Sequence, residues 1–567
     1  MARETKKRVL RDFRIGVYFC ECGPNIANAV ELDDVAQKLE KLPEVSSVKK
    51  HKLLCSGGGK KFMKDDIDEN NYTHIVVAAC SPKDHEATFA GVCEQSGINP
   101  YLYKIVNIRE QVAWMIKDKD KATDKVESYV KSAISRVQYQ SPLYQKELEA
   151  VSDVLIIGGG IAGIEAALSM ASDIRKVYLV EKNEKLGGKA AKLSSLLPHQ
   201  GLSANFIQDK IKAAQEDENI EIFYSSELES AIGFFGNFEI KVNKSDEDIG
   251  EKAEFNVGSI IVATGFEEYD ASKDDKFGLE KYDNILTAYQ AEQKLDEIIE
   301  QKPKQVAMIH CVGREKIGYC SGICCNYLMK LSSKLKSMDN DIQIRHIYRD
   351  IVVPNKADEK FYHKLKQDGI EFETGTGVEV SDGNGVSYKA EDGSEKHFEA
   401  DLVIMAPGMI PAKSTLELAE KLDIETDDFG FVSEEHYCLG SVNTSVDGVH
   451  VIGCAQSPRN IPDTIVQARA ASGRVLSRLV PGRKLLPEVA VSEVIESLCT
   501  GCQTCVTVCS YGAATYDETN GISIINEAIC RGCGNCVGSC PSGAVVSKHF
   551  TEKQLFQETI EAIIAGS

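Results

Sequence analysis

The cysteines near the carboxyl end have the residue type and spacing of iron–sulfur ligands. Residues 499–509 read C-T-G-C-Q-T-C-V-T-V-C, and residues 530–541 read C-R-G-C-G-N-C-V-G-S-C-P. Each run is C-x₂-C-x₂-C-x₃-C, which binds two [4Fe–4S] clusters when the fourth cysteine of each run ligates the other cluster. The two predicted ligand sets are Cys499, Cys502, Cys505 and Cys540, and Cys530, Cys533, Cys536 and Cys509. The alternative is a pair of structural zinc sites, whose ligands usually come as two C-x₂-C pairs with a longer gap.

A second group of cysteines follows predicted strands near the amino end. The β-branched runs at 14–20 (R-I-G-V-Y-F-C) and 74–80 (H-I-V-V-A-A-C) predict buried strands, and 53–60 (L-L-C-S-G-G-G-K) predicts a glycine-rich loop. Ligands at strand ends and loops of a parallel sheet can converge. The candidates are Cys20, Cys22, Cys55 and Cys80. The alternative is four buried or scattered thiols, as we interpret Cys93, which lies in an amphipathic stretch.

A third group lies in the middle of the chain, in H-C-V-G-R (310–314) and Y-C-S-G-I-C-C-N-Y-L-M-K (319–330). The C-x₃-C-C part is expected to open a helix, with the first cysteine at a preceding strand end. The candidate ligands are Cys311, Cys320, Cys324 and Cys325. A redox-inert helix with buried thiols is the alternative. We favour a cluster at these cysteines. They occupy the part of the chain in which a flavin reductase would carry a second glycine triplet for NADPH.

A dinucleotide site is predicted from residue 153 onward. D-V-L-I-I-G-G-G-I-A-G-I-E-A-A-L reads as a strand, a G-x-G-x-x-G turn and a helix, and V-Y-L-V-E (177–181) follows as the next strand. The glycines allow a pyrophosphate to approach the helix N-terminus, and the acid about twenty residues later suits a ribose. K-L-G-G-K (185–189) and I-I-V-A-T-G-F (260–266) are typical of FAD proteins with two dinucleotide domains. The predicted contacts are Gly158, Gly160, Gly163, Glu181, Lys182, Gly187, Gly188, Lys189, Ala263, Thr264, Gly265 and Gly453.

Two details qualify this flavin site. Cys454, after Gly453 in I-G-C-A, stands where such proteins usually have an aspartate that bonds the ribityl chain. Lys330 lies just over one helical turn after Cys325, so its ammonium could donate to flavin N5 as a catalytic group. A surface lysine on that helix is the alternative. An NAD-only Rossmann domain is the alternative to FAD.

Length, charge and hydropathy limit the class of protein. The 567 residues predict three or four domains, and 43% apolar residues suffice for their cores. A net charge of −21 disfavours nucleic acid and anionic membranes. M-A-R-E-T-K-K-R-V-L-R-D at the start has no apolar core, and no apolar run reaches eighteen residues, so we expect a cytoplasmic protein without a signal peptide or membrane insertion. Nineteen cysteines in such a protein indicate metal sites before disulfides.

The predicted fold class is α/β, with a thioredoxin-reductase-like two-dinucleotide-domain core. An α/β cluster domain with a helical linker is expected at 1–145 and an FAD-binding Rossmann domain at 146–300, completed by 430–485. A degenerate NAD(P)H-like domain with a cluster is expected at 301–429, and an α+β 2[4Fe–4S] ferredoxin domain at 486–567. Residues 552–566 predict an acidic amphipathic helix, either a cap or a docking face.

The whole pattern resembles the heterodisulfide reductase A family, including its bacterial relatives. Besides the flavin turn and the ferredoxin pair, the resemblance is carried by 16–26, 76–89, 99–111, 310–314, 319–325 and 460–468. Members carry a further ferredoxin-like insertion after the Gly-Gly element, beginning with a cysteine-rich stretch. Here 189–206 contains no cysteine. The chain is therefore identified as a trimmed member of that family.

The resemblance implies FAD and four [4Fe–4S] clusters, one in the N-terminal domain and one close to the flavin. It also implies that the flavin bifurcates electrons, sending one of a pair to a high-potential acceptor and one to ferredoxin. The implied partners are heterodisulfide-reductase B/C-like subunits, a hydrogenase delta-like subunit or a dehydrogenase module, and ferredoxin. We expect a dimer within a larger complex, with oxidoreductase activity only there.

Three alternatives stay open. One is an NAD(P)H-dependent oxidoreductase resembling the small subunit of glutamate synthase, disfavoured because the second glycine triplet is missing. Another is a non-bifurcating FAD and iron–sulfur electron wire, favoured by the missing insertion. The third is a scaffold with vestigial cofactors, disfavoured by sixteen cysteines in four sets.

Overall fold

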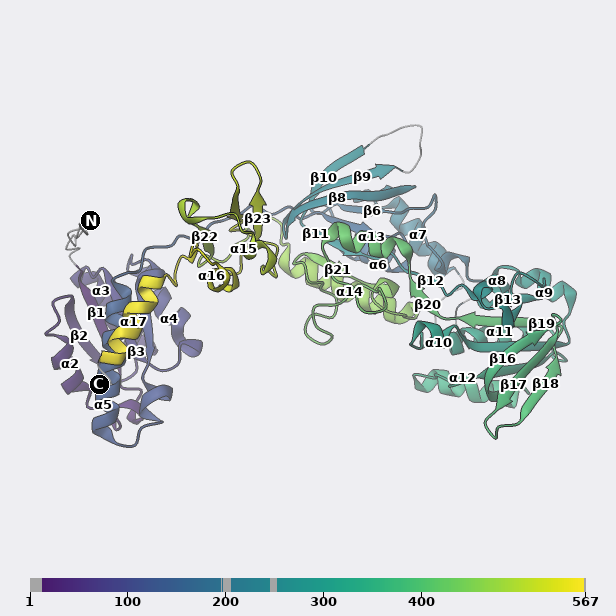
Figure 1. Ribbon diagram of the computed structural model, residues 1–567, viewed down its shortest axis with the longest axis horizontal. Coiled ribbons are helices and arrows are strands. Elements are labelled where there is room, and N and C mark those ends of the chain that lie inside the picture. Colours follow the sequence, from purple (N-terminus) through teal and green to yellow (C-terminus); the bar gives the residue numbers. More distant parts are fainter. Residues whose placement is uncertain (1–12, 195, 197–204, 245–251, 565–567) are drawn as a thin grey trace. The chain divides into compact units, whose positions relative to one another are not determined.

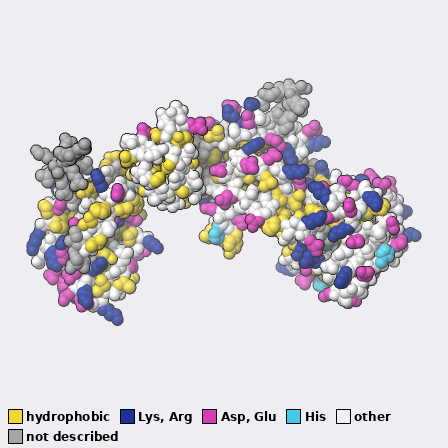
Figure 2. Space-filling view, in the orientation of Figure 1, with side chains coloured by type: hydrophobic (Ala, Val, Ile, Leu, Met, Phe, Trp, Pro, Cys, Tyr) yellow, Lys and Arg dark blue, Asp and Glu magenta, His cyan; other side chains and the backbone are white. Residues whose placement is uncertain are grey.

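The computed structural model describes residues 13–194, 196, 205–244 and 252–564. The predicted absence of a signal peptide at 1–12 lies outside these residues, as does half of the stretch 189–206, which is expected to lack the insertion. The described chain divides into two compact units, residues 1–148 with 486–567, and residues 149–485. The four predicted domain ranges stay a prediction, which this division does not test. Acidic and basic side chains intermingle on the visible face of each unit (Figure 2).

The N-terminal part of the first unit is a parallel sheet with strand order β2-β1-β3-β4, covered on both faces. Its strands are β1 (Ile15–Cys20), β2 (Val45–His51), β3 (His74–Ala79) and β4 (Tyr103–Asn107). Its helices are α1 (Pro24–Ala27), α2 (Leu32–Leu39), α3 (Gly57–Asn70), α4 (Pro82–Gln95) and α5 (Lys119–Val137). β1 and β3 are buried at every residue, which confirms the two predicted buried strands. They are neighbours, so their carboxyl ends, and the cysteines there, meet at one edge.

The C-terminal part of the first unit has two antiparallel strand pairs and two short helices. β22 (Ser492–Val494) pairs with β25 (Val545–Ser547), and β23 (Ala514–Asp517) pairs with β24 (Ile522–Ile525). α15 (Thr504–Thr507) and α16 (Asn535–Ser539) each begin inside one cysteine run. Cysteines belong to both small cores of this part, which contain few large apolar side chains.

The predicted C-terminal helix is present as α17 (Glu552–Ile564), and it packs against α5 of the N-terminal sheet domain (Figure 1). Arg136 of α5 is buried, pairs with Glu558 and also donates to the His549 carbonyl at 3.2 Å. Gln554 donates to the Tyr139 carbonyl at 3.0 Å. Of the two predicted roles, the structure shows a cap on the N-terminal domain.

Replacing Glu558 with glutamine should loosen α17. Arg136 would be left buried without its carboxylate partner, at a cost of about 1–3 kcal/mol. Hydrogen exchange of the amides in 552–564 should rise about tenfold or more. Glu561→Gln, on the same helix, is the matched control. Unchanged exchange in the Glu558 variant would show that the ion pair does not hold the helix.

The second unit begins with a five-stranded parallel sheet of order β21-β11-β5-β6-β7. Its strands are β5 (Val154–Ile157), β6 (Val177–Val180), β7 (Ile220–Phe223), β11 (Ser259–Val262) and β21 (Val449–Val451). Its main helices are α6 (Ile161–Met170), α7 (Phe206–Glu216) and α14 (Ile461–Arg478). An antiparallel sheet of β8 (Ser226–Phe234), β9 (Asn237–Lys244) and β10 (Lys252–Val257) packs on it. β21 comes from far along the chain, so this sheet needs the late segment to be complete.

The second sheet of this unit has the order β13-β19-β14-β15-β16-β17-β18. Its strands are β13 (Ile285–Thr287), β14 (Gln305–Val312), β15 (Gln343–Tyr348), β16 (Glu371–Ser381), β17 (Gly385–Ala390), β18 (Glu395–Glu399) and β19 (Leu402–Pro407). Its helices are α8 (Ala288–Gln293), α9 (Leu295–Gln301), α10 (Arg314–Ile317), α11 (Cys324–Met338) and α12 (Lys356–Gln367). β12 (Phe266–Glu268) pairs with β20 (Met409–Pro411), and α13 (Lys413–Leu422) packs against β8.

None of the helices in the described residues combines the length and the apolar character that a bilayer-spanning segment needs.

Candidate functional site

The turn between β5 and α6 requires glycine at two positions for packing reasons. Gly158 has φ +114°, and a Cβ there would lie 2.3 Å from the Ala263 carbonyl oxygen. A Cβ on Gly163 would lie 2.0 Å from the Gly158 carbonyl oxygen. Gly160 differs, because a Cβ there meets nothing within 4 Å. That position opens into a cavity at the N-terminal end of α6, where backbone N–H groups favour a phosphate.

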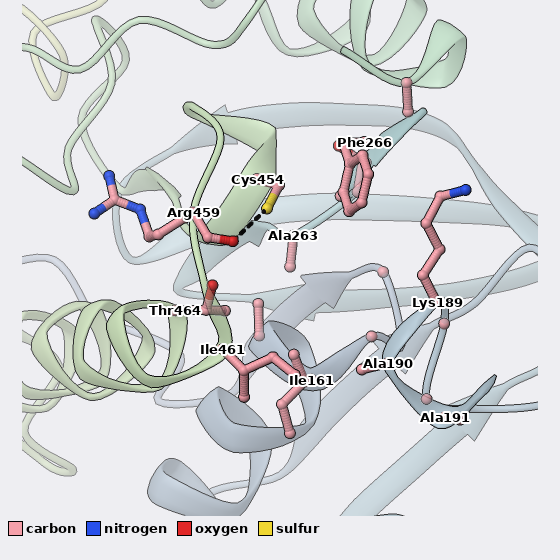
Figure 3. Close-up of a pocket in the computed structure, with 18 of the residues that line it drawn as sticks. Ile161, Lys189, Ala190, Ala191, Ala263, Phe266, Cys454, Arg459, Ile461 and Thr464 are labelled. Carbon is pink, nitrogen blue, oxygen red and sulfur yellow. Dashed lines mark hydrogen bonds between the residues drawn. The ribbon is translucent and has the colours of Figure 1, made fainter. Parts of the chain in front are cut away.

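The cavity has a volume of about 2030 Å³, large enough for an extended dinucleotide. Figure 3 shows Ile161 of α6, the Ala263–Phe266 segment after β11 and Arg459–Thr464 at the start of α14 around it. Of the predicted contacts, ten line it: Gly158, Gly160, Glu181, Lys182, Gly187, Gly188, Lys189, Ala263, Thr264 and Gly265. Gly163 and Gly453 lie behind the wall. The Gly453 N–H donates to Gln467 Oε1 at 2.7 Å.

Glu181 is buried after β6, and its carboxylate already holds the glycine turn. Oε2 accepts from the Gly159 N–H at 2.7 Å, and Oε1 accepts from the Asn183 N–H at 2.9 Å. A carboxylate has about four acceptor sites. Glu181 can therefore shape the turn and still accept from a ribose, the role predicted for it.

Two side chains give the cavity wall its chemical character. The Lys189 ammonium lies over the rings of Phe266, at 5.3 Å, and Tyr289, at 4.8 Å, so it is held at the wall by cation–π contacts. The Cys454 thiol donates to the Arg459 carbonyl at 3.3 Å (Figure 3). Burial raises the pKa of Cys454 to about 11, so this position offers a neutral thiol and not the usual carboxylate.

Lys330 lies in the buried part of α11 and lines the same cavity. Its Nζ is 2.7 Å from Glu292 Oε2 of α8 and 4.7 Å from the centre of the Tyr327 ring. Burial lowers the pKa of Lys330, and the Glu292 carboxylate opposes that shift. The alternative of a surface lysine is wrong. Sequence reasoning missed Glu292, whose other oxygen accepts from the Ser194 N–H at 2.8 Å.

The structure brings the N-terminal quartet together at the carboxyl edge of β1 and β3. Burial raises the pKa of Cys80 to about 11, with Cys22 and Cys20 close enough to raise it further. Burial also raises the pKa of Cys20, with contributions from Cys22 and Cys55. Leu54 N–H donates to the Cys20 sulfur at 3.4 Å. Four thiols at one edge fit the donor set of a [4Fe–4S] cluster.

The middle quartet lies between β14 and the start of α11. Cys311, Cys320, Cys324 and Cys325 line one small cavity. Burial raises the pKa of Cys324 to about 12, and Cys324 also lines the large cavity. The helix start predicted for the C-x₃-C-C run is confirmed by α11. A cluster on these thiols would border the dinucleotide site.

The C-terminal cysteines approach one another in the crossed arrangement predicted from spacing. The pKa of Cys536 is raised by burial first and then by Cys530, Cys509 and Cys533. The pKa of Cys502 is lowered by the Thr504 hydroxyl, with Cys540 acting in the opposite direction. No group of three or more His, Cys, Asp or Glu within the described residues is arranged to hold a single metal ion. Cubane ligands lie farther apart, because each thiolate binds a different iron.

Replacing Cys509 with serine tests the crossed arrangement. The variant should lose about four iron atoms, those of the Cys530, Cys533 and Cys536 set, because a hydroxyl is a poor ligand for iron in a sulfide cage. Iron analysis and EPR of the reduced protein measure this. Cys93→Ser, a buried thiol assigned to no cluster, is the control. Loss of the signal that depends on Cys499 would contradict the assignment.

Comparison with known families defines the class of protein. The pyridine nucleotide-disulphide oxidoreductase family matches residues 152–472, and the 4Fe-4S dicluster domain family matches residues 498–544. The chain is thus an oxidoreductase with the α/β flavoprotein fold expected, and these families imply FAD and [4Fe–4S] clusters. A solved thioredoxin reductase of T. acidophilum is 20% identical and covers 57% of this chain and 98% of its own, with a TM-score of 0.41.

Relatives that match along nearly their whole length identify the family. The A component of the H(2):CoB-CoM heterodisulfide,ferredoxin reductase of Methanothermobacter thermautotrophicus is 32% identical, over all of this chain and 99% of that protein. One of the iron-sulfur A components of the CoB--CoM heterodisulfide reductase of Methanopyrus kandleri is 32% identical, over 90% and 91% of the two chains. This chain therefore belongs to the heterodisulfide reductase A family.

The alignment with the Methanothermobacter protein also bears on the trimmed form. It extends over 659 positions, more than the 567 residues of this chain, all of which it includes. The relative therefore carries residues that have no counterpart here. Both relatives are named as subunits, which indicates that members of the family work with other chains.

Proposed function

We propose that this chain is the flavin-containing electron-transfer subunit of a multi-subunit reductase, in which paired electrons are split or merged between FAD and four [4Fe–4S] clusters. The observation that carries the proposal is the position of Cys324. It belongs to the middle quartet and lines the same cavity as the glycine turn. A cluster and a flavin would then be neighbours, which rapid single-electron exchange requires.

The residues of this chain have distinct parts in the proposal. Gly160 and the N-terminal end of α6 receive the pyrophosphate, and Glu181 accepts from the ribose. Lys330, fixed by Glu292, holds a positive charge at the cavity wall, which stabilises added negative charge on a flavin ring. Bound FAD supplies the exchange between electron pairs and single electrons. The three cysteine-rich regions hold the clusters that take single electrons away.

The proposed partners are other redox subunits and ferredoxin, with the chain as a dimer in the complex. The strongest competing function is a non-bifurcating electron wire, favoured by the residues that relatives have and this chain lacks. An NAD(P)H-dependent activity is disfavoured because β14 ends with Cys311 and Val312 and leads into α10 without a second glycine triplet for a dinucleotide.

Anaerobic stepwise reduction of the purified chain, followed at the flavin absorption band, distinguishes these functions. A bifurcating flavin takes up both electrons together, because the two single-electron potentials are crossed. A wire takes them up in two separate steps. Rapid bleaching of the flavin by NADH or NADPH would contradict the proposal and favour the pyridine-nucleotide alternative.

A further inference from the structure

One cysteine in each of the two quartets outside the ferredoxin domain has an unusual backbone. Cys22 has φ +48° and Cys311 has φ +58°, both in the left-handed region. For a residue with a side chain this conformation is unfavourable and persists where the surroundings impose it, often at functional sites. The two positions are unrelated in sequence and belong to different sheets. The sulfur of each of these two cysteines lies next to an arginine side chain.

At the N-terminal quartet the arginine is Arg109. Its Nη1 donates to the Cys22 sulfur at 3.3 Å. Glu110 accepts from its Nε at 3.1 Å, and the guanidinium lies 4.8 Å from the centre of the Trp114 ring. The contacts with Glu110 and Trp114 therefore hold one N–H group on the sulfur.

At the middle quartet the arginine is Arg314, three residues after Cys311. Its Nη1 lies 4.0 Å from the Cys311 sulfur and donates to Asp350 at 2.6 Å. The arrangement repeats that of Arg109: a carboxylate fixes a guanidinium against the sulfur of the left-handed cysteine. The contact with sulfur is longer, and the effect on the sulfur is correspondingly weaker.

We propose that Arg109 and Arg314 are positioning residues that raise the reduction potentials of these two clusters, each acting on its own. The inference rests on the proposed function for the presence of the clusters. Reduction adds one negative charge to a cluster, and a cation or hydrogen-bond donor at a ligand sulfur stabilises that charge. The carboxylates that fix the guanidinium groups reduce the rise in reduction potential. They do not cancel it, because an N–H group of each guanidinium lies against a ligand sulfur.

The function of these arginines is to make the two clusters better acceptors of a single electron. The cluster of the middle quartet borders the flavin cavity through Cys324. Raising its potential makes transfer from the cavity to this cluster more favourable. The same device at the N-terminal quartet makes that cluster a favourable acceptor too. We therefore assign both clusters to the branch that accepts electrons at higher potential.

The test is an EPR-monitored redox titration of the full-length chain with its clusters and FAD. Arg109→Gln should lower the ratio of reduced to oxidised N-terminal cluster about tenfold at a given potential. That change corresponds to a midpoint potential about 59 mV lower for one electron. Arg314→Gln should lower the midpoint potential of the middle cluster by a smaller amount. The lysine variants keep the charge but lose the fork geometry, so their midpoints should lie between wild type and glutamine. Cys20→Ser and Cys325→Ser identify the two signals by removing them.

Arg345→Gln is the matched control, since Arg345 pairs with Glu371 at 2.6 Å on β15 and β16. It should leave every midpoint unchanged. If a glutamine variant loses its cluster, the lysine variant carries the test. Unchanged midpoints with a full iron content would overturn this inference alone. An iron content of about eight atoms would overturn it together with the proposed function, because the two clusters would be absent.

Discussion

Replacing Lys330 with methionine is expected to reduce flavin-dependent electron transfer about a hundredfold or more, with the iron content unchanged. The ammonium is the cation that the structure fixes on α11 at the cavity wall by a 2.7 Å contact with Glu292. Its loss removes a preorganised positive charge from the place where negative charge develops on reduction. Flavin reduction by a strong donor, followed by the rate of cluster reduction in stopped-flow, measures the effect.

The same substitution also leaves Glu292 buried without a cation, and breaking a buried pair costs about 3–5 kcal/mol. Lys330→Met combined with Glu292→Gln removes that cost, so it should recover most of the stability but not the electron transfer. Lys334→Met on the same helix is the control and should change neither property. If the double variant recovers electron transfer, Lys330 is a structural residue only.

Replacing Gly160 with valine is expected to weaken FAD binding about a hundredfold or more while the chain folds normally. A Cβ at Gly160 meets no protein atom within 4 Å, and the position lines the cavity. It would occupy the space in which the pyrophosphate approaches the helix. Flavin content after dialysis, together with circular dichroism of the same sample, separates binding from folding.

Two other glycine substitutions serve as comparisons for the Gly160 variant. Gly163→Ala should fail at the folding stage, because its Cβ would lie 2.0 Å from a carbonyl oxygen. Gly473→Ala, in an exposed position of α14 with open space around it, should keep its flavin and be more stable by about 0.5–1 kcal/mol. Full flavin content in the Gly160 variant would mean that the dinucleotide does not cross this turn.

The sequence predicted what depends on local pattern. The strand, turn and helix at 154–170, the buried strands at 15–20 and 74–79 and the helix starting at Cys324 all follow from residue type and spacing. The two C-terminal ligand sets follow from cysteine spacing and stay a prediction. The family and the oxidoreductase class were predicted from several stretches of sequence together, and the comparisons confirm both.

The partners of the site residues could not be predicted in this way. Glu292 meets Lys330 only because α8 and α11 pack on the same sheet, and Arg109 reaches Cys22 across 87 residues of sequence. The return of α17 to α5 joins segments 422 residues apart at Arg136 and Glu558. Such contacts depend on topology and packing, which the periodicity of a single segment does not predict. In particular, no spacing in the sequence indicates which charged residues will pair with each other.

The most direct test of the central claim is an anaerobic count of iron, sulfide and flavin in the purified chain. The proposal predicts about sixteen iron atoms, about sixteen sulfides and one FAD per chain, since four quartets each hold one [4Fe–4S] cluster. About eight iron atoms would contradict it. The clusters would then be confined to the C-terminal pair, and the quartets at Cys22 and Cys311 would be thiols without iron.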